Sequence, residues 1–225
     1  MSHSIGLRKL LPSAPAIPHH RGMTNTVELV FDFGAPNGYL AWYPLRDLCA
    51  RVGADLKVLP VFLGGMHKLT GNAPPLFRDA EVKGKVPYAA LEFQRFLDRH
   101  EMTKFRMHPD LPFNTIMLQR ILVAAQDEGE RQALVEAMLP AVWERNIDAQ
   151  DPDAVRAELD TAGLDADRLI AATQDQTVKD GLAANTQAAV DRGAFGVPTM
   201  FVGAEMWFGK ERLGQIEDYL AGGKP

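Results

Sequence analysis

Two short segments at opposite ends of the chain constrain its fold more than any other feature. Residues 31–41, FDFGAPNGYLA, have the pattern of a strand that runs into the N-terminus of a helix. Residues 192–199, RGAFGVPT, have the pattern of a turn that leads into a strand through an X-Pro bond. Only about 5–6% of such bonds are cis in folded proteins, yet this context favours a cis bond between Val197 and Pro198 over a trans proline at the start of a strand. A cis bond there would leave the backbone of Val197 free to pair with an extended peptide.

The N-terminal part of the chain predicts a β-α-β unit. Apolar and polar side chains alternate over residues 27–33, which predicts a strand. Pro36 suits the first turn of a helix, which we expect to run through about Val52 and to end at Gly53. Residues 55–62 are rich in Val and Leu and predict a second strand. Two strands joined by one helix pair parallel, so we expect these two to be parallel neighbours.

The middle of the chain predicts only helices. The Gly64-Gly65 pair breaks the pattern, and helical periodicity then extends from about residue 68 to residue 180. Asp151 and Asp165 are suited to open two of these helices. The last part returns to a mixed pattern, in the order of a helix over 179–192, short strands over 199–202 and 206–208 around a turn at 203–205, and a closing helix that includes Leu213, Ile216 and Leu220.

This order of elements indicates an α/β fold, namely a thioredoxin-like sheet domain with an inserted all-helical domain. We assign residues 23–66 and 181–225 to the sheet domain, which is discontinuous in sequence, and residues 67–180 to the inserted domain. Residues 1–22 lack the apolar core of a secretory signal. We interpret them as a disordered leader, with a transit peptide as the alternative and Met23 as a plausible alternative start.

Composition excludes several classes of partner and of site. The net charge of −5 gives no electrostatic reason to expect nucleic acid or an anionic membrane as a partner. No apolar run approaches the ~20 residues of a spanning helix. Cys49 is the only cysteine, so no disulfide forms within one chain, and we expect a reducing, cytoplasmic compartment. Cys49 falls on the apolar side of a helix and is interpreted as a buried structural thiol. The histidines lack ligand spacing, and we expect no metal.

The residues best suited to chemistry lie where the first helix begins. Residues 34–37 stand at a helix N-terminus, where unpaired N–H groups favour a negative charge and lower the pKa of a thiol. Ala35 and Gly38 occupy the two positions where a dithiol enzyme of this fold would carry cysteines. We therefore expect the thiol to arrive with a cofactor. The alternative is a strand-to-helix turn without chemical function.

Two further segments are candidates for binding. Residues 208–213 open the last helix, and their N–H groups together with Lys210 suit a carboxylate. The alternative there is a solvated helix start. Residues 70–75, TGNAPP, form a loop by composition, of the kind that often covers a site.

These segments, in this order and spacing, resemble 2-hydroxychromene-2-carboxylate isomerases and the related kappa-class glutathione transferases. Both groups belong to the DsbA-like branch of the thioredoxin superfamily. The resemblance extends over nearly all of residues 27–220. The segments that carry it are FDFG with PN and YLA over residues 31–41, LGG at 63–65, TGN at 70–72, PFNT at 112–115, RG with FGVPT over 192–199, and FGKERL at 208–213.

The resemblance implies a glutathione cofactor and a small aromatic substrate. It implies that Val197 pairs its backbone with the cysteinyl part of glutathione beside cis-Pro198. It places Lys210 and Glu211 near the γ-glutamyl end. It places Asn72 near the glycine end or the substrate. Lys85 is a looser match among the cofactor-binding residues, because the loop before it is longer than expected. A homodimer is the default assembly of such proteins.

The implied reaction is an isomerisation in which the glutathione thiolate adds to the unsaturated substrate, a bond rotates, and elimination follows. The family usually has a serine at the position of Ala35, and its hydroxyl bonds the glutathione sulfur. Without that hydroxyl, we expect the helix N-terminus and Asn37 to substitute in part. Two alternatives stay open, a transferase or peroxidase of the kappa type and a glutathione-binding relative without catalysis. A dithiol oxidoreductase is excluded by Ala35 and Gly38.

Overall fold

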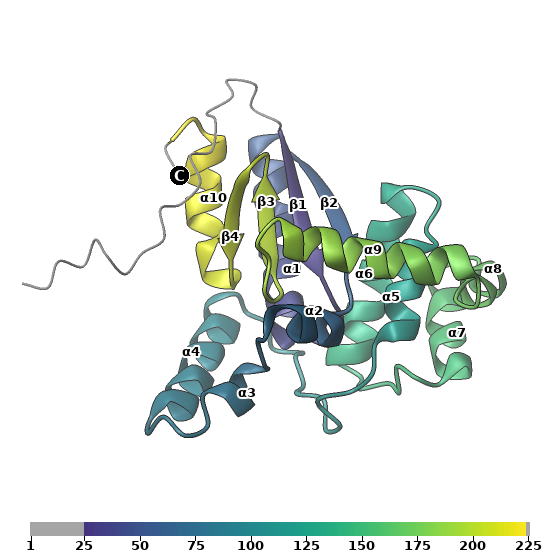
Figure 1. Ribbon diagram of the computed structural model, residues 1–225, viewed down its shortest axis with the longest axis horizontal. Coiled ribbons are helices and arrows are strands. Elements are labelled where there is room, and N and C mark those ends of the chain that lie inside the picture. Colours follow the sequence, from purple (N-terminus) through teal and green to yellow (C-terminus); the bar gives the residue numbers. More distant parts are fainter. Residues whose placement is uncertain (1–24, 224–225) are drawn as a thin grey trace, which may run out of the picture.

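The computed structural model describes residues 25–223, which form one sheet flanked by helices (Figure 1). The interpretations of residues 1–22 and of Met23 lie outside the described residues. The assigned domain boundaries stay a prediction. In the described part of the chain, no helix has the length and apolar character needed to cross a membrane.

The four strands are paired in the order β2-β1-β3-β4. The strands are β1 (Thr26–Phe31), β2 (Asp55–Pro60), β3 (Thr199–Val202) and β4 (Glu205–Phe208). Strand β1 pairs parallel with β2, as the β-α-β pattern predicts, and antiparallel with β3. The C-terminal β3–β4 hairpin therefore lies directly beside the N-terminal strand, which brings the two ends of the chain together in one sheet.

The alternation of side chains along β1 directs its residues to two separate apolar clusters. Leu29 and Phe31 are fully buried in the larger cluster, together with α1 (Pro36–Val52). Val30 points the other way, into a smaller cluster that includes Ala189 of α9 (Gln176–Asp191). In Figure 1, α9 passes in front of the sheet and α1 lies behind it. Both faces of the sheet are thus covered, which accounts for the apolar character of β1.

Helix α1 begins and ends where the sequence predicts. Pro36 is its first residue, and Gly53 ends it in the left-handed conformation with φ of 68°. Cys49 is buried in the larger cluster, as predicted, and burial raises the pKa of its thiol to about 11. A thiol of that pKa is protonated at neutral pH, so Cys49 is a packing residue.

Helices fill the rest of the chain. They are α2 (Leu63–Thr70), α3 (Pro75–Arg78), α4 (Lys85–Arg99), α5 (Ile116–Val123), α6 (Glu128–Trp143), α7 (Pro152–Thr161), α8 (Ala166–Ala172), α9 and α10 (Leu213–Leu220), with a short 3₁₀ turn over Lys210–Arg212. Asp151 and Asp165 cap α7 and α8 through their side chains, as predicted. Figure 1 shows α5 to α8 to one side of the sheet, beyond β2, while α3 and α4 project at the opposite lower corner.

The interpretation of Gly64-Gly65 as a break in the pattern is wrong, because α2 begins at Leu63 and runs through both glycines. The two glycines make room for the ring of Phe62. A Cβ at Gly64 would lie 2.9 Å from Phe62 Cζ, and a Cβ at Gly65 would lie 3.1 Å from Phe62 Cδ1. The two glycines therefore serve the packing of the Phe62 ring, which residue type and periodicity do not predict.

Candidate functional site

The turn between β1 and α1 leaves the start of the helix without a side-chain cap. Ala35 is the N-cap residue, in an extended conformation, and has no side chain that could accept a hydrogen bond. Its methyl group is buried, with 7% of the residue exposed. The N-terminus of α1 therefore carries a buried methyl group at the position where a hydroxyl side chain would offer a hydrogen-bond donor.

Asn37, in the first turn of α1, carries an unsatisfied acceptor. Its Oδ1 is buried and has no hydrogen-bond partner among the described residues. A buried polar atom without a partner is uncommon in native structures. This atom could accept a hydrogen bond from an N–H group of a bound molecule.

Asp32 lies beneath this turn and is a functional candidate that the sequence analysis did not single out. It is fully buried, and its carboxyl accepts hydrogen bonds from Gly34 N (2.8 Å), Leu63 N (2.7 Å) and Thr115 Oγ1 (2.6 Å). Burial raises the pKa of Asp32 above its ordinary value, and the hydrogen bonds offset this only in part. The carboxyl thereby fixes the turn before α1 to the starts of α2 and α5. The available signal was an acidic residue between Phe31 and Phe33, directly after the end of the strand.

The loop before β3 presents an unpaired backbone. The Val197–Pro198 peptide bond is cis. Neither the N–H nor the C=O of Val197 has a hydrogen-bond partner among the described residues, whereas the carbonyl of Pro198 accepts from Gly209 N at 3.0 Å. Because both the N–H and the C=O of Val197 are free, an extended peptide could form backbone hydrogen bonds with it and pair as an added strand.

The fold brings this loop to the N-terminus of α1. Ala35 and Val197 belong to the same small apolar cluster, which also contains Phe201 of β3. The two segments from opposite ends of the sequence thus meet where β1 ends and β3 begins, at one end of the two central strands. They meet there because β1 and β3 are hydrogen-bonded neighbours.

Asn72 contacts the same loop from the other side. Its Nδ2 donates to the carbonyl of Phe195 at 2.7 Å, two residues before Val197. Its Oδ1 accepts from Ala73 N at 2.9 Å and lies 3.4 Å from Nη1 of Arg78. The family resemblance implies a place for Asn72 at the site, whereas its contact with this loop depends on tertiary packing.

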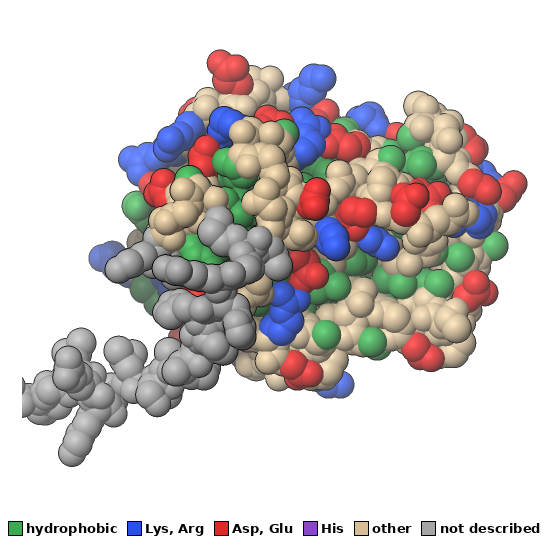
Figure 2. All heavy atoms as spheres, turned by 90° about the horizontal axis from the view of Figure 1, so that it is seen from above, with side chains coloured by type: hydrophobic (Ala, Val, Ile, Leu, Met, Phe, Trp, Pro, Cys, Tyr) green, Lys and Arg blue, Asp and Glu red, His purple; other side chains and the backbone are tan. Residues whose placement is uncertain are grey.

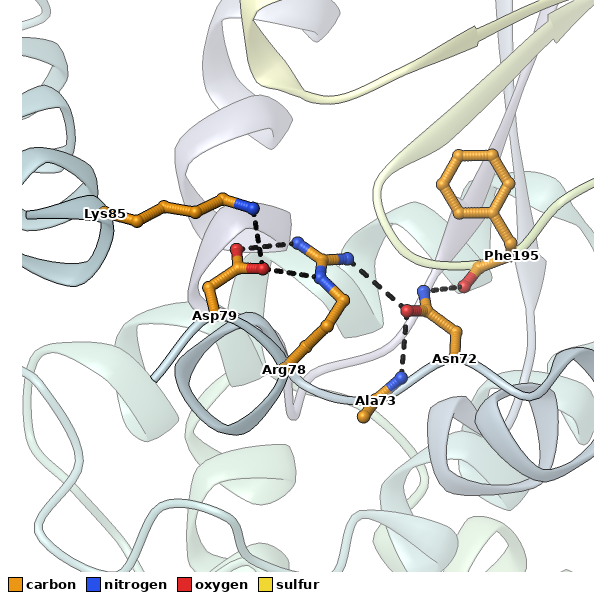
Figure 3. Close-up of polar contacts among 6 residues, drawn as sticks. All are labelled: Asn72, Ala73, Arg78, Asp79, Lys85 and Phe195. Atoms are coloured by element: carbon orange, nitrogen blue, oxygen red, sulfur yellow. Dashed lines mark hydrogen bonds and ion pairs between the residues drawn. The ribbon is translucent and has the colours of Figure 1, made fainter. Parts of the chain in front are cut away.

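Lys85 is linked to Asn72 only through two intermediate residues (Figure 3). Its Nζ lies 2.8 Å from Oδ1 of Asp79, and Asp79 also pairs with the guanidinium of Arg78. The hydrogen bonds from Arg78 and Lys85 lower the pKa of Asp79 well below its usual range. Lys85 therefore carries a charge that is already paired, at the far end of a polar chain that leads to Phe195.

Lys210 points inward. Only 6% of it is exposed, its Nζ pairs with the carboxylate of Glu211, and it lies 5.2 Å from the ring centre of Phe96. The side chain of Glu211 is 56% exposed. Burial acts to raise the pKa of Glu211, but the hydrogen bond and charge of Lys210 outweigh it, so this pKa is lowered. The charged group of this pair that reaches solvent is the carboxylate of Glu211, which could bind the amino group of a ligand.

Two partly exposed phenylalanines flank the loop. The ring centres of Phe195 and Phe208 lie 4.5 Å apart, and each residue is more than a third exposed. A Cβ at Gly196 would lie 3.0 Å from Phe208 Cε2, so the glycine lets this ring lie against the backbone. The pair offers an apolar surface directly beside Val197.

Charged side chains of both signs occur on the surface outside the site. On the face drawn in Figure 2, acidic and basic side chains are interspersed. Over residues 25–223, no group of three or more His, Cys, Asp or Glu side chains is arranged to hold a metal ion.

Comparisons with known proteins match nearly the whole described chain. A family profile described as the DSBA-like thioredoxin domain matches residues 26–221. A 2-hydroxychromene-2-carboxylate isomerase of Sphingobium xenophagum is 30% identical over 198 residues, which cover 88% of this chain and 99% of that protein. Human glutathione S-transferase kappa 1 is 27% identical over 220 residues, with 90% and 93% covered. A solved structure of a 2-hydroxychromene-2-carboxylate isomerase superposes with a TM-score of 0.74 at 26% identity, covering 87% of this chain and 94% of that one.

Proposed function

Since the chain belongs to the DSBA-like thioredoxin domain family and is similar along its length to 2-hydroxychromene-2-carboxylate isomerases, we propose that it is a glutathione-dependent isomerase. Its substrate would be a small aromatic compound of the 2-hydroxychromene-2-carboxylate type. The observation that carries the proposal is the unpaired backbone of Val197, beside cis-Pro198 and next to the N-terminus of α1. The single, buried Cys49 agrees with a reducing, cytoplasmic compartment.

The residues present fit a thiol tripeptide. The N–H and C=O of Val197 are available to pair with its central residue, and the orphaned Oδ1 of Asn37 would accept from one of its N–H groups. The exposed carboxylate of Glu211 would hold the amino group at the γ-glutamyl end. Asn72 holds the loop at Phe195 and would line the opposite end.

Bound glutathione would supply the nucleophilic thiol that this chain lacks at positions 35 and 38. The start of α1 would stabilise negative charge on that thiol through the helix dipole and its free N–H groups. The Phe195–Phe208 pair would receive the flat ring of the substrate.

Ala35 supports a second candidate function. The cap of α1 has no side-chain donor, so a bound thiol there would keep a higher pKa than with a serine at this position. A slow enzyme or a binding protein without catalysis would follow from a weaker thiolate. A kappa-type transferase or peroxidase stays the other alternative, and it too would need a thiolate.

The test is calorimetric titration of reduced glutathione into the wild type and into Ala35→Ser, with an isomerase assay on the same samples. Ala89→Ser, on the exposed surface of α4, is the matched control. We expect both proteins to bind and Ala35→Ser to turn over faster. Binding without turnover in either, together with conjugation of a chlorodinitrobenzene, would favour the transferase. Absence of binding in both would refute the proposal.

A further inference from the structure

A polar cavity lies between α5, the end of α8 and the segment before α7, among the helices beyond β2 (Figure 1). Its volume is about 270 Å³. Five polar residues line it, together with two apolar residues of α5. The polar residues are Asn114, Arg120, Gln150, Thr173 and Gln174, and the apolar ones are Ile116 and Met117. None of these residues belongs to the site around Val197, so the cavity is a separate feature of the molecule.

Arg120 is the one charged residue of this lining, and its guanidinium is poorly paired. Its Nη1 donates to the carbonyl of Thr173 at 3.4 Å. Its Nε is buried and has no hydrogen-bond partner among the described residues. Arg131 and Arg168 each pair with a glutamate, whereas no carboxylate of residues 25–223 pairs with Arg120. Because charged groups in partly buried places are normally paired, this guanidinium keeps both its charge and its donors for a ligand.

The outer end of the guanidinium is open to a ligand. Nη2 of Arg120 also has no partner in the described part of the chain but, unlike Nε, it is accessible to solvent. Asn114 is exposed at the same cavity, and its Oδ1 accepts from Ile116 N at 2.9 Å. That contact leaves the NH₂ group of Asn114 as a second donor. A guanidinium and an amide donor together suit an anionic group.

The rest of the lining favours a carboxylate attached to a small apolar body. A guanidinium binds a carboxylate through two parallel N–H···O bonds. The single cation of the lining balances one negative charge, whereas a phosphate would bring up to two. Ile116 and Met117 offer apolar contact, and no Asp or Glu lines the cavity to repel an anion. Its volume lies just below the roughly 300–1,000 Å³ of ligand pockets, which suits a small molecule.

We propose that this cavity binds a small organic carboxylate. Arg120 and Asn114 hold the carboxylate group, and the apolar body packs on Ile116 and Met117. The proposal is independent of glutathione and of the isomerase reaction.

Calorimetric titration of benzoate into the full chain tests the proposal. Benzamide is the uncharged probe of the same shape, and inorganic phosphate is the second anion. We expect benzoate to bind the wild type, and benzamide and phosphate to bind at least about tenfold more weakly. Arg120→Gln should weaken benzoate binding by a similar factor. Arg99→Gln, which changes an exposed arginine of α4, is the matched control and should leave benzoate binding unchanged.

Circular dichroism on the same samples shows whether Arg120→Gln keeps its fold. If it does not, Gln174→Glu carries the test, because it adds a negative charge at an exposed position of the lining and should also weaken benzoate binding. Gln215→Glu, at an exposed position of α10, is its control.

Several results would overturn the proposal. They are absence of benzoate binding, equally tight binding of benzamide or phosphate, benzoate binding that both cavity variants leave unchanged, and displacement of benzoate by saturating reduced glutathione. Benzoate binding that depends on Arg120 in a protein that does not bind glutathione would count against the proposed function and not against the cavity.

Discussion

Replacement of Asp32 by asparagine tests the buried carboxyl that ties the turn before α1 to the rest of the fold. The carboxyl accepts from Leu63 N through Oδ2, and from Gly34 N and Thr115 Oγ1 through Oδ1. An amide has one acceptor oxygen, so either orientation sets its NH₂ group against a backbone N–H, that of Leu63 or that of Gly34. A buried donor left without a partner costs about 1–3 kcal/mol. We expect Asp32→Asn to lower the free energy of unfolding by that amount.

The effect of the same substitution on the free energy of unfolding should depend on pH, and the raised pKa of Asp32 fixes the sign of that dependence. The pKa of Asp32 is raised in the folded state, so the carboxyl binds its proton more tightly there than in the unfolded chain. The stability linked to this proton is fully present below the unfolded pKa of 3.8 and is lost as the pH rises through the folded value. Asparagine does not titrate. The difference in stability between the wild type and Asp32→Asn should therefore shrink as the pH rises.

Urea denaturation across roughly pH 5 to 8 measures both effects. Asp165→Asn is the control, because Asp165 caps α8 through its side chain and asparagine caps equally well. A difference that stays constant or grows with pH would refute the raised pKa. An Asp32→Asn protein as stable as the wild type at the low end of the range would refute the role of the three hydrogen bonds.

Two further predictions concern the thiol and the loop contact. The thiol of Cys49 should resist a thiol-specific chromogenic reagent at about neutral pH and react on unfolding, since burial raises its pKa to about 11; fast reaction of the folded protein would contradict this. Asn72→Ala removes the hydrogen bond to the carbonyl of Phe195 and should lower stability by about 1 kcal/mol. It should also weaken glutathione binding several-fold by calorimetry, and unchanged affinity would show that this contact does not position the loop.

The order of the elements was predictable from the sequence because it depends on local patterns. Alternation over residues 27–33, Pro36 at the start of α1 and Gly53 at its end each act within a few neighbouring residues, and the structure has these elements where the patterns indicate. The parallel pairing of β1 with β2 follows from their connection by a single helix. The meeting of residues 31–41 and 192–199 also followed once the two halves of the sheet were recognised.

Tertiary structure alone decided the environment of particular side chains. Asp32 is a buried acceptor because Leu63 and Thr115 converge on it from two other helices. Gly64 lies within α2, and the ring of Phe62 occupies the place where a Cβ of residue 64 would be. The charge of Lys210 faces Glu211 and the ring of Phe96 rather than solvent. The partners of Asp32 and the ring of Phe96 are distant in sequence and become neighbours only on folding, and periodicity and residue type carry no information about such pairs.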